Sequence, residues 1–500
     1  MNTEILSITQ MKQAEDASLS GRTSGYTLMQ RAGRAVADII REKYEKQTVL
    51  VLCGSGNNGG DGFIAASELK RKKWDVTIAC KLEAEYLEGD VARAAEEWGD
   101  DFETLDKVKL PEDGIIIDAI FGTGLEREIT GDAQEILFAL QRSSCSVVAI
   151  DVPSGVYADS GDCQPCTPQA DLTVTFFRKK MGHILLPGRV ACGDIIVSDI
   201  GMKDDVLDEI EGEIVHENDP SLGWQEDAST KAFWTHKYHH GHIAVLGGRI
   251  LTGATVLTSL SALRIGAGLV TIAAHPDVMT VYRMASPSLM VEPLQEMARF
   301  KEHYSKDDRR NVLLIGPGAG LENEGALKKI VFDATASERI CVLDADALSV
   351  FENDTRTFYK SLNRNCILTP HEGEFERIFP GLQGSKVDRA LEASKKTGAI
   401  IVLKGADTVV ASPSGKAVIN TTGCGWMATA GTGDVLAGMI AGLAARKVLS
   451  LFDAACAAVW MHGKASELAG PGMISEDLSS HIPSVLALLN EPPETVETEE

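Results

Sequence analysis

The sequence predicts an α/β protein made of two doubly wound domains with mainly parallel sheets. Apolar runs rich in β-formers alternate with helical stretches from Thr48 to Gly201, and a second series of the same kind starts at His242. Such alternation indicates βαβ crossovers. A length of 500 residues is sufficient for two or three domains, each with its own hydrophobic core.

The first series defines the expected strands of the N-terminal domain. They are TVLVLC (48–53), DVTIAC (75–80), GIIIDAI (114–120), SVVAIDV (146–152), DLTVTFF (171–177) and DIIVSDI (194–200). Before them, residues 29–44 repeat apolar side chains at helical spacing, which predicts a helix packed on the sheet. Between about Met202 and Lys237 the pattern gives way to an acidic, turn-rich stretch, where we place the domain boundary.

The second series predicts a larger doubly wound domain. Its expected strands are HIAVLGG (242–248), LVTIAAH (269–275), NVLLIGPG (311–318), ICVLDAD (340–346), NCILTPH (365–371), IIVLKGAD (400–407) and TVVASPS (408–414). Helical stretches such as ATVLTSLSALRIG and DVLAGMIAGLAARKV lie between them. We therefore assign residues 1–215 and 222–490 to the two domains, and residues 491–500 to an acidic disordered tail.

Composition restricts the partners. The net charge of -24 opposes binding to a polyphosphate backbone, so nucleic acid is not an expected partner, and anionic ligands must be held by helix N-termini and Gly-rich turns. The longest apolar stretch, residues 265–274, is too short for a bilayer, and charged residues interrupt the first 19 residues, so we expect neither a membrane span nor a signal peptide. The 10 scattered cysteines fit a reducing, cytoplasmic location.

Three turns of the first domain carry candidate chemistry, because ligands gather at the carboxyl ends of parallel strands. They are the Gly-rich segment 54–62, the segment 118–128 and the segment 151–155. Asn58, Asp118 and Ser154 would bring oxygen ligands to one crevice, with Asp151 as a proton carrier; alternatively, the aspartates cap the turns that follow them. The segment contains G-x-G-x-x-G, but the next strand ends in Cys80-Lys81 without a ribose-binding acid, which disfavours a dehydrogenase.

Together GSGNNGGDG, DAIFGTGL, DVPSG, ADLTVTF and KMGHILLPG resemble the NAD(P)HX epimerase domain. The resemblance implies a Rossmann-like fold and a substrate that is NADH or NADPH hydrated at C6 of the nicotinamide ring, in R and S forms. It implies that Asn58, Asp118 and Ser154 bind K+. It makes Asp151 a catalytic residue that touches the substrate. The other substrate-binding residues that it implies are Asn57, Asn58, Gly59, Gly60, Asp61, Gly122, Thr123, Gly124, Leu125, Glu126, Arg127 and Glu128.

Epimerisation at this carbon requires the ring nitrogen to expel hydroxide, which then returns from the other face. One carboxylate that shuttles a proton is sufficient for this chemistry. Lys180, in KKMGH, is either a partner of the substrate pyrophosphate or a solvated lysine in a basic run.

In the second domain the strongest motif is AGTGDVLAG (430–438) at the start of a helix. Its backbone amides would form an anion hole for a transferring phosphoryl group, and Asp434 is placed to accept a hydroxyl proton; the alternative is an ordinary capped helix start. Upstream, Lys404–Thr408 suits nucleotide phosphates. Asp344 and Asp346 organise a magnesium shell or cap a turn, and His371 taken alone is more typical of a structural histidine.

The segments HGHIAVLGG, GPGAG, LDADAL, LTPHEGEF, LKGADT and GTGDVLAG resemble the ADP/ATP-dependent NAD(P)HX dehydratase, a ribokinase-like fold. This resemblance implies that ADP or ATP is a co-substrate, with Mg2+. It implies that the hydrated dinucleotide contacts Ala254, Gly316, His371 and Asp434. It implies that the adenine nucleotide contacts Lys404, Gly405, Ala406, Asp407, Thr408 and Gly433. Phosphorylation would convert the hydroxyl, a poor leaving group, into one that the ring nitrogen can expel.

Some positions depart from the family pattern: Cys424-Gly425-Trp426 stands before the anion hole, Arg249 follows a glycine pair, and Ser288 follows Pro287. Histidines 236, 239, 240 and 242 suggest a metal site only weakly. The leading hypothesis is a bifunctional repair enzyme that assembles into a homo-oligomer and takes NADHX, NADPHX and an adenine nucleotide. The alternative is a ribokinase-like kinase for a vitamin precursor, fused to a non-catalytic dinucleotide-binding module.

Overall fold

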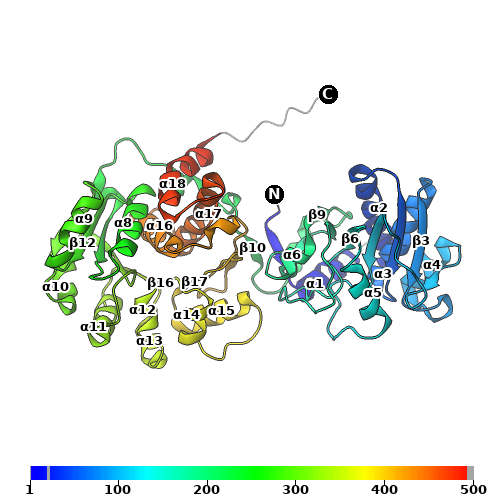
Figure 1. Ribbon diagram of the computed structural model, residues 1–500, viewed down its shortest axis with the longest axis horizontal. Helices are drawn as coiled ribbons and strands as arrows, with labels where there is room; N and C mark the ends of the chain where they lie inside the picture. The colour runs from blue at the N-terminus through cyan, green and yellow to red at the C-terminus, as the bar shows by residue number, and fades with distance from the viewer. Residues whose placement is uncertain (1, 20–22, 492–500) are drawn as a thin grey trace. The chain divides into compact units, whose positions relative to one another are not determined.

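The computed structural model describes residues 2–19 and 23–491 (Figure 1). Contacts within the chain divide it into two compact units, Asn2–Ile214 and the part that begins at Val215. Each unit is described separately below. Of the expected acidic tail, residues 492–500 lie outside the described residues.

The first unit contains a parallel sheet with the strand order β4-β3-β2-β5-β6-β7-β9. The direction of the strand order reverses between β2 and β5, as in dinucleotide-binding folds. All the strands expected from the first series are confirmed. Their bounds are β2 (Thr48–Cys53), β3 (Asp75–Cys80), β5 (Ile115–Ala119), β6 (Ser146–Ile150), β7 (Leu172–Phe176) and β9 (Asp194–Ser198). The sequence analysis missed the two-residue edge strand β4 (Glu103–Thr104).

Helices cover both faces of this sheet, which explains why its strands are apolar throughout. In β2, Val49 and Val51 belong to the core shared with α2, α3 and α4, whereas Leu50 and Leu52 belong to the core shared with α5. A separate pair of short strands, β1 (Glu4–Leu6) and β8 (Lys179–Lys180), runs parallel. The helices are α1 (Ile8–Leu19), α2 (Gly25–Lys43), α3 (Asn57–Arg71), α4 (Gly89–Trp98), α5 (Asp132–Leu140) and α6 (Gly188–Cys192).

The second unit contains a sheet with the order β13-β12-β11-β14-β15-β16-β17-β18-β19-β10. Strand β18 is antiparallel to both neighbours, and the other printed pairs are parallel. The bounds are β10 (Val215–Glu217), β11 (His242–Leu246), β12 (Leu269–Ala274), β13 (Met290–Pro293), β14 (Arg310–Ile315), β15 (Ile340–Leu343), β16 (Cys366–Leu368), β17 (Ile400–Leu403), β18 (Val409–Ala411) and β19 (Ala417–Ile419). The sequence analysis missed β10, β13 and β19 because runs this short carry little periodicity.

Two helical layers enclose the second sheet (Figure 1). One layer contains α8 (Thr252–Arg264), α16 (Thr432–Arg446), α17 (Leu451–Ala469) and α18 (Ser475–Asn490). The other contains α11 (Glu324–Thr335), α14 (Glu372–Ile378) and α15 (Lys386–Thr397). Shorter helices are α7 (Gln225–Ser229), α9 (Met279–Ala285), α10 (Phe300–Tyr304), α12 (Asp346–Ser349) and α13 (Thr355–Ser361). The long helix α16 is buried from Val435 onward, so the motif at its start sits on a rigid element.

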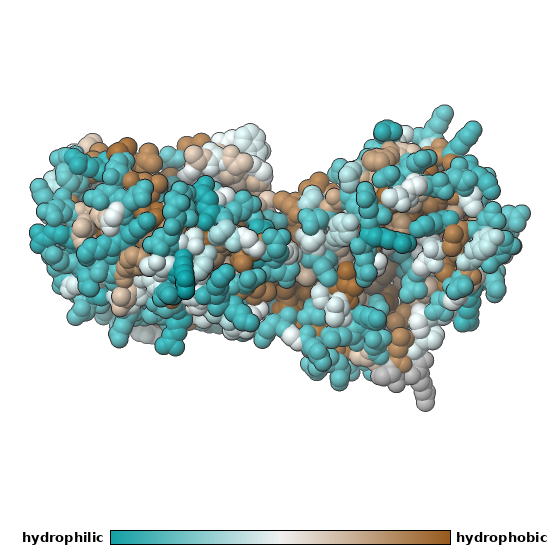
Figure 2. Space-filling view, turned by 90° about the horizontal axis from the view of Figure 1, so that it is seen from below, coloured by the Kyte–Doolittle hydropathy of each residue, from teal (hydrophilic) through white to brown (hydrophobic). Residues whose placement is uncertain are grey.

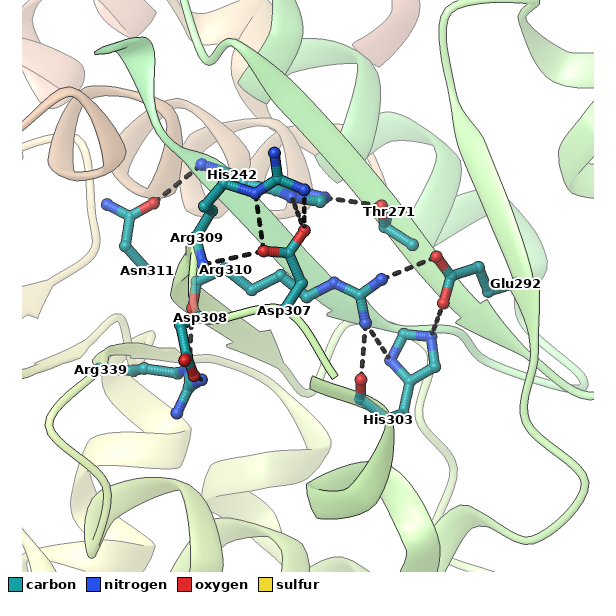
Figure 3. Close-up of polar contacts among 10 residues, drawn as sticks. All are labelled: His242, Thr271, Glu292, His303, Asp307, Asp308, Arg309, Arg310, Asn311 and Arg339. Carbon is teal, nitrogen blue, oxygen red and sulfur yellow. Dashed lines mark hydrogen bonds and ion pairs between the residues drawn. The ribbon is translucent and has the colours of Figure 1, made fainter. Parts of the chain in front are cut away.

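A partly buried polar network connects β11, β12, β13 and β14 of this second sheet (Figure 3). The guanidinium of Arg310, the first residue of β14, donates to Glu292 Oε1 at 2.7 Å and to the backbone oxygen of His303 at 2.6 Å. His242, the first residue of β11, places Nε2 2.7 Å from the Thr271 hydroxyl. His242 and Arg310 begin their strands, at the end of the sheet opposite to that where ligands gather, so we interpret the network as structural.

The histidines near residue 240 form no metal cluster. Among residues 2–19 and 23–491, no group of three or more His, Cys, Asp or Glu side chains is placed to hold a metal ion. His236 and His239 instead stack on each other, and His240 Nε2 lies 2.8 Å from the Thr235 hydroxyl.

His242 makes the stability of the second unit depend on pH. Burial and the neighbouring Arg310 lower the pKa of His242 to about 4, whereas an unfolded histidine titrates at about 6.5. Between these values the unfolded chain binds the extra proton, so the free energy of unfolding falls as pH decreases from about 6.5 to 4. We expect His242→Gln, whose amide can still hydrogen-bond the Thr271 hydroxyl, to reduce that slope by up to about one proton. Urea unfolding across this pH range measures it, and an unchanged slope contradicts the assignment.

The exposed face drawn in Figure 2 is covered mostly by hydrophilic residues. Within the part of the chain that the structure describes, no helix is long and apolar enough to cross a membrane.

Candidate active sites

The first unit contains a cavity of about 530 Å³ at the carboxyl ends of β2, β5 and β6. It brings together three groups of predicted residues: the start of α3, the loop after β5 and Asp151 after β6. The predicted residues that line it are Asn57, Asn58, Asp61, Gly122, Thr123, Gly124, Leu125, Arg127 and Asp151. The predicted residues Gly59, Gly60, Glu126 and Glu128 are not among the lining residues.

Gly59 and Gly60 act through close packing. A Cβ on Gly59 would lie 1.9 Å from the backbone oxygen of Gly54, and one on Gly60 would lie 2.5 Å from the Met29 side chain. Their absence of a side chain lets α3 start directly against the turn that follows β2, so the amides of its first turn face the cavity.

Asp151 is held from several sides. Its backbone has φ +67°, an uncommon value for a residue with a side chain. Lys180 donates to Oδ1 at 2.8 Å, and the Thr123 amide donates to Oδ2 at 3.2 Å. Burial raises the pKa of Asp151, but the ammonium of Lys180 outweighs it and brings that pKa down to about 2. The carboxyl is therefore ionised and oriented at neutral pH.

The structure corrects one of the two expectations for Lys180, that of a solvated lysine. The side chain is 2 % exposed, so it is not solvated, and its ammonium is engaged by Asp151, the Thr175 hydroxyl and the backbone oxygen of Phe176. Pairing with a substrate pyrophosphate would require these bonds to break. The sequence analysis missed this burial because the side chain of Lys180 turns inward only when β8 pairs with β1, and these two strands are far apart in the chain.

Two of the expected K+ ligands touch. Asp118, fully buried at the end of β5, accepts from the Ser154 hydroxyl at 2.6 Å and from the Ser154 amide at 2.8 Å. Burial raises the pKa of Asp118. With the side-chain amide of Asn58 in its favoured orientation, its nitrogen donates to the backbone oxygen of Ile150 and its oxygen accepts from the amide of Gly122. Carboxylate, hydroxyl and amide oxygens are the hard donors that an alkali cation takes, so the donor set fits K+.

The second site lies at the carboxyl ends of β15 and β17 and at the start of α16. Lys404 forms an ion pair with the buried Asp344, Nζ to Oδ1 2.7 Å. The same ammonium lies 3.3 Å from the point where a Cβ on Gly433 would stand. The lysine therefore reaches the first turn of α16, where backbone amides are free to bind an anion.

Asp434 follows in that turn. Burial, together with the charges of Asp344, Asp346 and Glu374, raises the pKa of Asp434 to about 6, although Lys404 acts in the opposite direction. A carboxyl with this pKa is ionised at neutral pH and still a useful base. Below the turn, His462 of α17 places Nε2 2.9 Å from the Thr432 backbone oxygen and supports its position.

The segment Lys404–Thr408 is a tight turn between β17 and β18. The Thr408 hydroxyl donates to the Gly405 backbone oxygen at 2.7 Å. Asp407 pairs with Lys386, Nζ to Oδ1 2.5 Å, an interaction that the sequence analysis missed because no motif links α15 to this turn. Ala406 follows Gly405 in the same turn.

The remaining predicted residues have clear local roles. Gly316, after β14, has φ +125°, and a Cβ there would lie 1.7 Å from the backbone oxygen of Asp344. His371 is the N-cap of α14: its Nδ1 accepts from the Glu374 amide, while Glu374 accepts from the His371 amide. Ala254 lies in the first turn of α8. Asp346 accepts from the Gly320 amide at 2.8 Å, as a turn-capping residue does.

The three departures from the family pattern occupy surface or loop positions. Arg249 forms an ion pair with Asp277, and both side chains are more than half exposed. The amide of Cys424 donates to Ser466 Oγ, and Trp426 is half exposed. The amide of Ser288 donates to Ser286 Oγ.

Comparisons with known proteins agree with this architecture. A family described as NAD(P)H-hydrate dehydratase matches residues 243–484, and one described as YjeF-related protein N-terminus matches residues 25–182. A bifunctional NAD(P)H-hydrate repair enzyme of Thermofilum pendens is 32% identical over 94% of this chain and 93% of its own. Its counterpart in Escherichia coli is 32% identical over 95% and 92%, respectively. The ADP/ATP-dependent NAD(P)H-hydrate dehydratase of Bacillus subtilis, co-crystallised with ATP and Mg2+, is 27% identical over 54% of this chain and 96% of its own, with a TM-score of 0.46.

The fold and the two sites thus define a two-domain α/β enzyme, with a parallel dinucleotide-binding type of sheet in the first half and a larger, mainly parallel sheet in the second. The chain belongs to the family of bifunctional NAD(P)H-hydrate repair enzymes.

Proposed function

We infer that this chain repairs hydrated NADH and NADPH in two steps. The first unit interconverts the R and S epimers at C6, and the second dehydrates the S epimer back to NAD(P)H with consumption of ADP or ATP. The observation that carries this function is the similarity to repair enzymes along both units of one chain. It favours the repair function over the alternative of a vitamin-precursor kinase with a silent first module.

In the first unit we assign catalysis to Asp151 and substrate binding to the cavity around it. The ring nitrogen expels the hydroxyl as hydroxide, and the ionised carboxylate accepts a proton from the water that adds to the other face. That proton then passes to the expelled hydroxide, so the reaction consumes no net proton. Lys180 and the Thr123 amide orient the carboxylate. Asn58, Asp118 and Ser154 would hold K+, which supplies a fixed positive charge near the cavity when it is bound. The proximity of the Asp118–Ser154 pair supports this site.

In the second unit we assign the general base to Asp434 and the nucleotide site to Gly433 and Lys404–Thr408. Asp434 accepts the proton of the substrate hydroxyl as phosphate transfers to its oxygen. The nitrogen lone pair then expels phosphate, and loss of a proton from the neighbouring ring carbon restores the double bond. Ala254, Gly316 and His371 complete the substrate side. Mg2+, which enters with the nucleotide, would offset phosphate charge. The half-buried carboxylate of Asp346 is the kind of oxygen ligand that Mg2+ prefers.

Gly433 tests the nucleotide site. Gly433→Ala is expected to raise the KM for the nucleotide about tenfold, because a methyl group 3.3 Å from Lys404 Nζ displaces one charged contact. Alanine is favoured over glycine within a helix, so stability should not fall. Gly325→Ala, whose Cβ would meet open space in α11, is the matched control. Steady-state dehydration with varied nucleotide measures the effect, and equal KM values for the two variants contradict the assignment.

The function as a whole is tested by incubating the purified chain with mixed R and S NADHX, Mg2+ and either ADP or ATP, and following dihydronicotinamide absorbance. Complete recovery supports both activities and identifies the nucleotide. Recovery that stops at the S fraction leaves a dehydratase joined to an inactive first unit. No recovery with either nucleotide contradicts the proposal.

We also propose a cytoplasmic homo-oligomer. All 10 cysteines are free, and eight of them are buried, which suits a reducing compartment. Exposed apolar side chains such as Phe233, Trp234 and Met284 offer surface for self-association. Light scattering of the purified chain measures the oligomeric state.

A further inference from the structure

Lys81 occupies the position that contacts the adenosine ribose in dinucleotide-binding sheets. It directly follows β3, and β3 is the neighbour of β2, the strand that leads into the Gly-rich turn. Its amide donates to the Cys53 backbone oxygen at 2.9 Å, which fixes it beside the end of β2. In sheets with this strand order, the residue after that neighbouring strand contacts the adenosine ribose: an acidic side chain binds the 2′-hydroxyl, and a basic one accommodates a 2′-phosphate.

The side chain of Lys81 lines the same cavity as Asn57 and Asp151. Three cations line that cavity: Lys81, Arg127 and Lys180. Lys180 is neutralised by Asp151. Across the described part of the chain, no ion pair engages the Lys81 ammonium, which lies 4.9 Å from the centre of the Phe121 ring on the cavity wall.

An uncompensated cation in this cavity is notable in a chain with a net charge of -24. The carboxyl group of Asp90 also lines the cavity and opposes an anionic group beside it. Glu15 and Asp61 line it too, but burial raises the pKa of both carboxyl groups. Among the described residues, Lys81 and Arg127 are the lining cations without an ion pair, and of these Lys81 stands at the end of β3, where the adenosine ribose is bound in such sheets. A phosphate on that ribose would therefore meet Lys81 and form a charge-assisted hydrogen bond with it.

We propose that Lys81 is a specificity-determining residue of the first unit: it binds the 2′-phosphate of hydrated NADPH and makes the epimerase prefer NADPHX over NADHX. This inference rests on the proposed epimerase function. The chemical group recognised is a phosphate monoester dianion, which only NADPHX carries. The pyrophosphate, the other possible phosphate source, is common to both substrates, so the two substrates distinguish the two contacts.

The test compares epimerisation of (R)-NADPHX and (R)-NADHX by the full chain and its Lys81→Met variant. Loss of one charged hydrogen bond predicts a 10- to 100-fold lower kcat/KM for NADPHX, with the NADHX value within about twofold of the unchanged chain. Lys81→Glu supplies the acid that binds a ribose 2′-hydroxyl, and is expected to reverse the preference in favour of NADHX. The matched control is Lys72→Met, at the far end of α3 and exposed.

Each outcome is decisive. An equal loss on both substrates identifies a pyrophosphate or structural role and overturns the inference, as does no loss on either. Retained epimerisation of NADHX reports that the first unit of each variant is folded, and dehydration of S epimers reports the same for the second unit. Failure of the proposed function itself looks different, because the unchanged chain would then epimerise neither substrate.

Discussion

Asp434→Asn is expected to lower the rate of dehydration by about 10²- to 10⁴-fold, the usual contribution of a positioned general base. Asparagine has the same shape but does not accept the hydroxyl proton as phosphate transfers. The carboxyl is surrounded by three other acidic side chains, so removing its charge should leave the fold intact and slightly relieve repulsion. Absorbance of regenerated NADH from the S epimer, with nucleotide and Mg2+, measures the loss.

The pH profile provides an independent check on the same residue. With a pKa of about 6, Asp434 is protonated below that value, so dehydration by the unchanged chain should decline as pH falls through about 6. Asp308→Asn, a fully exposed aspartate of the same unit, is the control and should behave as the unchanged chain. An Asp434→Asn variant with normal turnover would remove Asp434 as the base.

Asp151→Asn is expected to abolish epimerisation, again by about 10²- to 10⁴-fold, while the second unit continues to dehydrate S epimers. Asparagine tolerates the positive φ of this position better than alanine does, so the backbone should be retained. With a mixed substrate, recovery of NADH should then stop at the S fraction. Turnover of both epimers by the variant would exclude this role.

Because Lys180 is a buried ion-pair partner of Asp151, the substitution can also lower stability, and a second variant separates the two effects. Removing the charge of Asp151 leaves the Lys180 ammonium buried without its counter-ion, which costs about 3–5 kcal/mol in typical cases. The double variant Asp151→Asn/Lys180→Met removes both charges. We expect it to recover thermal stability relative to the single variant and to remain unable to epimerise, which separates catalysis from folding.

Local patterning was sufficient for much of this protein. The apolar runs predicted the long strands and the α/β class, because strands buried on both faces read as continuous apolar segments. The Gly-rich turns and strand-end aspartates predicted where Asn58, Asp151 and Asp434 lie, because parallel strands bring their carboxyl ends to one edge. Short strands such as β13 and β19 were not predicted, since three or four residues carry little periodicity.

The sequence by itself therefore determined the fold class and the turns that carry the chemistry, since both follow from short-range periodicity and residue type. Only the tertiary structure decided which charged side chains pair with one another at those turns. Lys180 reaches Asp151 through the pairing of β8 with β1, Lys404 reaches both Asp344 and Gly433, and Lys81 stands in the cavity without an acidic partner among the described residues. The reason is physical: a pKa depends on burial and on charges brought together from distant segments, and neither is encoded in the spacing of a motif.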